Sequence, residues 1–195
     1  MTKVDRIMEI ARADRIDFDA LEAALDDATH PERVEATRMW NKSIQRRIFE
    51  QAEGRAVTLE QLVPGKEPLD PVHHWGKNTI APGLVDHFQK RFARLPGRVD
   101  VLAGYNESWY RWAVCPGYYL AYEDADTGEV VVDYTRLPDA KPDAWPEIVP
   151  NWSRLGIAVF YGMTDRLRRV SDHVTQGRAY KKKPMNQYFV LVRED

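Results

Sequence analysis

Apolar residues in the first third of the chain recur every three or four positions, as on one face of an amphipathic helix. Two short stripes are formed by Val4, Ile7, Met8 and Ala11 and then by Leu21, Ala24, Leu25 and Ala28. A longer stripe between Thr29 and Gly54 contains Val34, Thr37, Trp40, Ile44, Ile48 and Ala52. Thr29 and Glu32 have capping-box spacing and Gly54 is a typical stop, so the pattern predicts one long helix here.

Residues 56–97 predict short helices joined by a loop. Thr58 and Gln61 have the spacing of a helix N-cap, and a polar loop containing prolines covers 66–82. In the stretch 83–97 one helical face would carry Leu84, Phe88, Phe92 and Leu95. This spacing predicts a helix that ends at Pro96-Gly97.

The pattern changes in the second half of the chain. Short runs rich in β-branched and aromatic residues predict strands at 98–105, 118–124, 129–135, 156–162 and 186–194. Gly128 sits in a predicted hairpin turn at positive φ. The spacing of residues 164–177 predicts a late helix, and the proline-rich segment 138–153 is expected to be a loop that covers a site.

Together these elements predict an α+β fold. N-terminal helices would pack on a curved, mainly antiparallel sheet of about five strands, with one late helix. We expect a single domain over residues 1–195, made of a helical portion (1–55), short helices and a loop (56–97), and the sheet with its helix (98–195).

Composition excludes several classes of function. The net charge of −2 gives no bulk attraction to nucleic acid or an anionic membrane, so we expect no membrane as a partner, and nucleic acid is disfavoured. A single cysteine, Cys115, excludes an internal disulfide and a cysteine zinc cluster. The charged N-terminus lacks the apolar core of a secretory signal, and no apolar run is long enough to span a membrane, so we expect a cytoplasmic protein.

Three of the five histidines, His73, His74 and His87, fall within residues 71–88. Their spacing matches no metal motif, so we expect neither a metal nor a cofactor. A single histidine acting as a general base, His74 or His87, is the favoured chemistry if the protein is an enzyme, which the sequence leaves open.

Residues 104–122 contain five of the nine tyrosines and two of the six tryptophans. Such rings either pack in a core or line a pocket, and the polar residues among them, Asn106, Glu107 and Arg111, favour the pocket. We therefore expect ligand contacts from Tyr105, Asn106, Trp109, Arg111, Tyr119, Tyr134, Arg136 and Phe160. Arg111 or Arg136 would anchor an anionic group of the ligand.

The leading hypothesis is a small-molecule-binding protein whose ligand is apolar or aromatic with an anionic group. The alternative is a protein–protein interaction module that uses the N-terminal helices or the basic segment 164–183, with a homodimer or another protein as partner. Residues 163–183 carry seven basic and two acidic side chains, so a third, weaker alternative is RNA binding.

Overall fold

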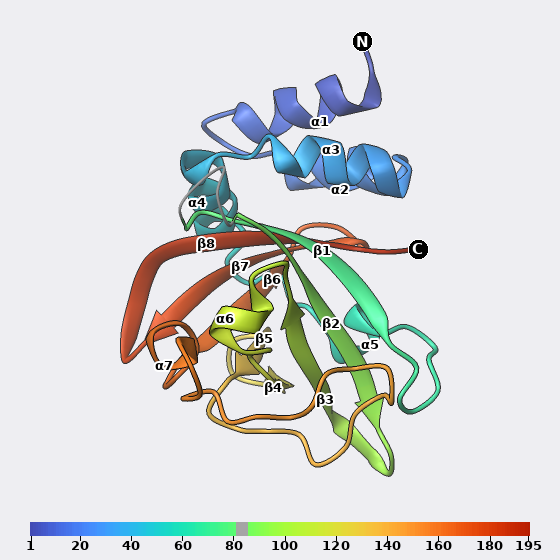
Figure 1. Cartoon of the computed structure of the whole chain (residues 1–195). Coiled ribbons are helices and arrows are strands. Elements are labelled where there is room, and N and C mark those ends of the chain that lie inside the picture. Colours follow the sequence, from blue (N-terminus) through green and yellow to red (C-terminus); the bar gives the residue numbers. More distant parts are fainter. Residues whose placement is uncertain (81–85) are drawn as a thin grey trace.

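The centre of the molecule is a closed β-barrel. The computed structural model describes residues 1–80 and 86–195, in which eight antiparallel strands each pair with their neighbours in the chain and β8 pairs with β1 (Figure 1). The strands are β1 Val72–Asn78, β2 His87–Leu95, β3 Arg98–Glu107, β4 Tyr119–Asp124, β5 Glu129–Asp133, β6 Thr164–Arg169, β7 Val174–Lys181 and β8 Lys183–Arg193. The expected open sheet of about five strands is therefore wrong, since closure leaves no free sheet edge.

Several elements differ in type from the prediction, and residues 72–78, expected within the polar loop 66–82, form strand β1. Residues 87–95, expected in a helix, form strand β2, while positions 83–85 of that predicted helix lie outside the described residues. The late helix expected at 164–177 is instead β6 and the start of β7. Residues 156–162, expected as a strand, contain the short helix α7 Gly156–Val159, and a second short helix, α6 Arg111–Val114, precedes β4.

Four helices cover one side of the barrel, α1 Lys3–Arg12, α2 Phe18–Asp26, α3 His30–Arg38 and α4 Lys42–Gln51 (Figure 1). Their buried residues, among them Ile7, Leu21 and Ile48, pack against the outward side chains Val190 and Val192 of β8. The predicted long helix is interrupted because Asn41 starts a new helix, accepting a hydrogen bond from the backbone N–H of Ile44 at 3.0 Å.

Several local signals are confirmed. Thr29 and Glu32 form a capping box, and Thr58 Oγ1 accepts from the N–H of Gln61 at 3.0 Å to start α5 Leu59–Leu62. Gly128 has φ of 68° in the hairpin between β4 and β5. These signals depend on neighbours in the sequence, which explains why they can be recognised without the tertiary structure.

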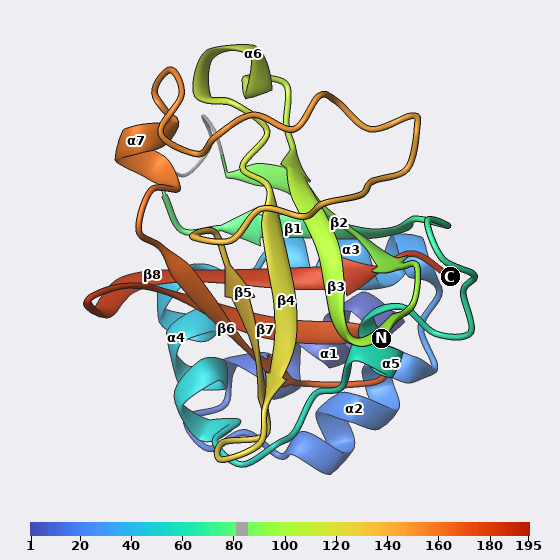
Figure 2. The ribbon, with the colours of Figure 1, turned by 90° about the horizontal axis from the view of Figure 1, so that it is seen from below.

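The proline-rich segment 138–153 lies on the outer wall of the barrel, across β3 and β4 (Figure 2). Trp145 packs on the rings of Tyr105 and Tyr118, with centroid distances of 5.0 and 6.4 Å. Asn151 Nδ2 donates to the carbonyl oxygens of Tyr118 and Tyr134 at 2.6 and 2.7 Å. This segment therefore packs along the side of the barrel. The prediction that it covers a site is wrong.

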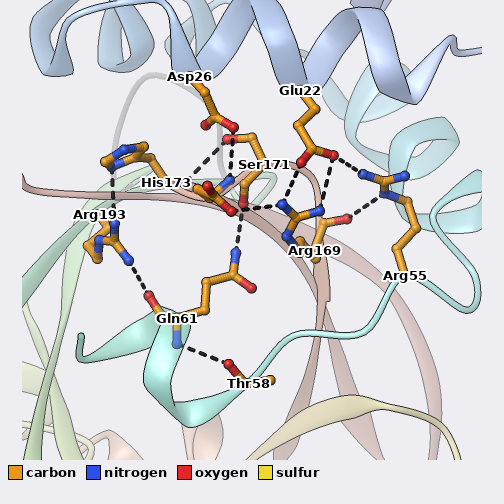
Figure 3. Close-up of polar contacts among 10 residues, drawn as sticks. Glu22, Asp26, Arg55, Thr58, Gln61, Arg169, Ser171, His173 and Arg193 are labelled. Carbon is orange, nitrogen blue, oxygen red and sulfur yellow. Dashed lines mark hydrogen bonds and ion pairs between the residues drawn. The ribbon is translucent and has the colours of Figure 1, made fainter. Parts of the chain in front are cut away.

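Helix α5 closes one end of the barrel. Leu59 and Leu62 pack with Val72, Phe92 and other inward side chains in a core that fills this half of the interior. Polar contacts fix the closed end to the N-terminal helices (Figure 3). Gln61 Nε2 donates to the carbonyl of Ser171 at 2.7 Å, and the Glu22 carboxylate pairs with Arg55 and Arg169. Arg169 pairs with both Glu22 and Asp172, which explains the nearness of these two carboxylates, and Asp26 Oδ2 accepts from the backbone N–H of Asp172 at 3.4 Å.

Gly104 in the barrel wall leaves space for the ring of Tyr119. A Cβ added to Gly104 would lie 2.3 Å from the Tyr119 ring and 2.5 Å from the carbonyl oxygen of Arg91, which is backbone. We expect Gly104→Ala to lower the free energy of unfolding by about 2–3 kcal/mol, because neither neighbour can move freely. Urea unfolding measures this, with Val99→Ala on the same strand, 87% exposed, as a control that changes it by less than about 0.5 kcal/mol.

Candidate functional site

The end of the barrel opposite α5, here called the mouth, contains a hollow. In an antiparallel barrel alternate connections lie at the same end, so the described connections β3–β4, β5–β6 and β7–β8 lie at the mouth. Figure 2 places α6 and α7 together at this end. The cavity has a volume of about 420 Å³, and its apolar lining includes Phe88, Phe160, Met163, Ala179, Met185 and Phe189.

A buried lysine forms part of this cavity. Lys90 points inward from β2 and is only 1% exposed. Its Nζ donates to Asn106 Oδ1 at 3.0 Å and to the phenol oxygen of Tyr134, and it pairs with Asp165 Oδ2 at 3.0 Å. An ammonium group has three N–H donors, so all of them are engaged within the protein.

Aromatic rings surround the same ammonium group. The Lys90 Nζ lies 4.9 Å from the centroids of Tyr119 and Tyr134, 5.2 Å from that of Phe189 and 5.9 Å from that of Phe88. Contacts with ring faces at these distances stabilise a cation that has lost its water. The rings and Asp165 together account for a lysine in the barrel interior.

Asp165 has one engaged and one open oxygen. Its Oδ2 accepts from Tyr134 at 3.1 Å in addition to its pairing with Lys90. Within residues 1–80 and 86–195, Oδ1 accepts no hydrogen bond, and Asp165 belongs to the lining of the cavity. A carboxylate oxygen retains the capacity to accept a hydrogen bond there.

Burial changes the protonation equilibria of the cluster formed by Lys90, Asn106, Tyr134 and Asp165. Desolvation lowers the pKa of Lys90 and raises that of Asp165, and their mutual attraction opposes both shifts. The pKa of Tyr134 is raised well above its ordinary value by burial and by the Asp165 charge. Tyr134 therefore stays protonated at neutral pH, and the lysine–aspartate pair has no net charge whichever group holds the proton.

The structure brings together four of the residues expected to bind a ligand. Asn106, Tyr134 and Phe160 line the cavity, where the Tyr134 and Phe160 rings stack at 5.2 Å. Tyr119 lies beside them in the interior and is fully buried, with its hydroxyl donating to the carbonyl of Arg91 at 3.2 Å. Asn106 comes from β3 and Tyr119 from β4, whereas Tyr134 directly follows β5 and Phe160 directly follows α7.

The other four expected ligand residues, Tyr105, Trp109, Arg111 and Arg136, do not line the cavity. Tyr105 faces the outer wall, where its hydroxyl donates to Glu107 at 2.9 Å. Arg111 pairs with Glu107 at 3.0 Å, and Arg136 is exposed beside the ring of Tyr122. The cationic group at the cavity is therefore the ammonium group of Lys90 on β2. Neither Arg111 nor Arg136 reaches the cavity.

Neither of the two histidines considered as general bases lines the cavity. His74 is buried in the closed half, where its Nε2 donates to the carbonyl of Leu62 at 2.9 Å. Burial lowers the pKa of His74 to about 3. His87 lies with Trp109 in a shallow groove of about 290 Å³ on the outside of the barrel, and its Nδ1 is 3.2 Å from Asp86.

Cys115 lines the cavity near its mouth and is buried. Its pKa is raised, chiefly by burial, which keeps the thiol protonated. This environment favours a packing role over that of a nucleophile.

Sequence reasoning missed Lys90 and Asp165. Lys90 stands between Phe88 and Phe92 at alternate positions, and Asp165 stands two residues before Leu167. A charge in line with apolar residues at strand spacing is the signal that marks both as inward-facing.

A barrel with one packed half, one hollow half and a polar cluster at the boundary is compatible with the class of ligand-binding barrels. Comparison with known proteins adds no name to this class, since no family model, no curated protein and no solved structure matches the chain. Among the described helices, none has the length and apolar character needed to cross a membrane.

Proposed function

We propose that this protein binds a small, largely apolar molecule in the barrel cavity, with the polar end of that molecule at Asp165. The observation that carries the proposal is a buried, charge-balanced cluster beside an apolar hollow. The volume of about 420 Å³ falls in the usual range for small-molecule sites, about 300–1,000 Å³.

The charges of the cluster favour a neutral ligand. Lys90 and Asp165 already balance each other, so an anionic ligand would add an uncompensated charge to a buried site. The three donors of Lys90 are engaged, whereas Asp165 Oδ1 is open as an acceptor. A hydroxyl or N–H group on the ligand would complete the cluster, in place of the anionic group expected from Arg111 or Arg136.

The proposal concerns binding and assigns no reaction. Neither His74 nor His87 belongs to the cavity lining, so neither supports the acid–base enzyme considered from the sequence. The alternative of docking through the N-terminal helices would be supported by large apolar side chains such as Trp40 and Phe49 if they were exposed there. Both are buried in the chain's own core, which leaves Met39 as the exposed member of that group.

Three naphthalene probes test the proposal by isothermal titration calorimetry. 2-Naphthol carries a hydrogen-bond donor, 2-methoxynaphthalene carries none, and 2-naphthoate is anionic at neutral pH. We expect 2-naphthol to bind at least tenfold more tightly than either of the others, because a hydrogen bond to a charged acceptor contributes about 1.5–3 kcal/mol. Failure of all three to bind would contradict ligand binding, whereas tighter binding of 2-naphthoate would contradict only the neutral-ligand argument.

The variant Asp165→Asn tests whether Asp165 is the residue that contacts the polar end of the ligand. This change removes the charge that balances Lys90, so the preference should shift towards 2-naphthoate. Asp100→Asn is the matched control, because Asp100 is an exposed carboxylate on β3. The control should keep the wild-type preference, and an equal shift in both variants would remove the assignment to Asp165.

A further inference from the structure

Large apolar side chains are exposed at the mouth of the barrel. They lie in the segments around α6 and α7 that border the cavity. Their exposed fractions are 69% for Trp109, 72% for Trp112, 61% for Trp152, 61% for Leu155, 54% for Ile157 and 53% for Tyr161. Side chains of this size gathered at one end of a protein indicate an interaction surface.

The same surface is basic. The segments 108–118 and 151–163 and the end of the β7–β8 hairpin (181–187) contain Arg111, Arg154, Lys181, Lys182 and Lys183 and no aspartate or glutamate. Arg111 pairs with Glu107 at the end of β3, and Glu147 lies in the same groove as Trp112 and Arg154. The three lysines lie at the β7–β8 turn, where Lys181 ends β7 and Lys183 starts β8, and are exposed. The mouth therefore combines exposed rings with positive charge, although the whole chain has a net charge of −2.

We propose that the mouth of the barrel docks on an anionic lipid surface. Tryptophan and tyrosine side chains favour the interface between lipid headgroups and acyl chains, and lysines near an anionic bilayer contribute electrostatic attraction. Leu155 and Ile157 favour lipid over nucleic acid as the occupant, because aliphatic side chains gain by entering acyl chains and offer no stacking surface to bases. Docking in this orientation would face the cavity opening towards the bilayer.

Vesicle co-sedimentation of the full chain tests this proposal independently of any cavity ligand. We expect the protein to bind vesicles of mixed phosphatidylserine and phosphatidylcholine, to bind phosphatidylcholine vesicles much more weakly, and to be released as salt is raised. Brominated acyl chains in the bound vesicles should quench the tryptophan fluorescence. Binding to an RNA homopolymer with no binding to either kind of vesicle would overturn the proposal.

Two sets of variants locate the surface. Reversal of the charges in Lys181→Glu, Lys182→Glu and Lys183→Glu together should weaken vesicle binding by about a hundredfold or more, since each lysine near the surface contributes about fivefold. Trp112→Ser with Leu155→Ser should also weaken binding and reduce the quenching. Val99→Ser removes an apolar side chain that is 87% exposed at the other end of the barrel and should bind as the wild type does. An equal loss in Val99→Ser would overturn the orientation.

Discussion

Replacing Lys90 by methionine is expected to lower the free energy of unfolding by about 3–5 kcal/mol at neutral pH, the usual cost of breaking a buried ion pair from one side. The substitution keeps most of the side-chain volume but leaves Asp165 buried without its cation. It also removes hydrogen bonds from Asn106 and Tyr134. Urea unfolding measures the effect.

The double variant separates charge from packing. Lys90→Met with Asp165→Asn removes both charges, so it should recover much of the stability lost in the single variant. Lys66→Met breaks an exposed ion pair with Asp70 and should cost less than about 1 kcal/mol. A double variant no more stable than Lys90→Met alone would show that the uncompensated charge is not the cause of the loss.

Acid should destabilise the protein partly through His74. Its pKa falls from the ordinary 6.5 to about 3 in the folded chain, chiefly through burial, so between these values the unfolded chain binds a proton that the folded chain does not. The contribution of His74 to stability is therefore complete above pH 6.5 and is lost as the pH falls towards 3. The loss approaches about 1.4 kcal/mol per pH unit.

His74→Gln tests this linkage, because glutamine does not titrate and its Nε2 can still donate to the carbonyl of Leu62. Urea unfolding at several pH values should show a shallower dependence in the variant than in the wild type. His87→Gln changes a histidine at the mouth that is half exposed and should keep the wild-type slope. Equal slopes in the wild type and His74→Gln would contradict a neutral, buried His74.

Two of the missed strands, β2 and β6, contain a charged residue that faces the barrel interior. Phe88, Lys90 and Phe92 alternate inward on β2, yet with Lys90 read as polar the apolar residues of that stretch also fit a helix. Asp165, read as polar, interrupted the strand pattern of β6 in the same way. The charge-bearing residues of the candidate site are thus the ones that hid its strands, because their burial depends on a partner on a distant strand.

Several signals set by near neighbours were recognised correctly, although the N-cap at Asn41 was missed, and the signals set by distant contacts were not recognised. The caps at Thr29 and Thr58 and the turn at Gly128 depend on a few adjacent residues. Closure of the barrel depends on pairing of β1 with β8, more than a hundred residues apart in the chain. For the site, aromatic density at 104–122 pointed to Asn106 and Tyr119, whereas the register that turns Tyr105 outward was not visible.

Methyl NMR with ¹³C-labelled methionine most directly tests the central claim that a small molecule binds in the barrel cavity. Two of the five methionines line the cavity and the other three do not. Met163 and Met185 line the cavity, Met8 is buried beneath the N-terminal helices, and Met1 and Met39 are exposed elsewhere. On titration with 2-naphthol we expect the Met163 and Met185 signals to shift with one shared affinity while the other three stay in place. Shifts at Met8, Met1 or Met39 without shifts at Met163 and Met185 would contradict binding inside the barrel.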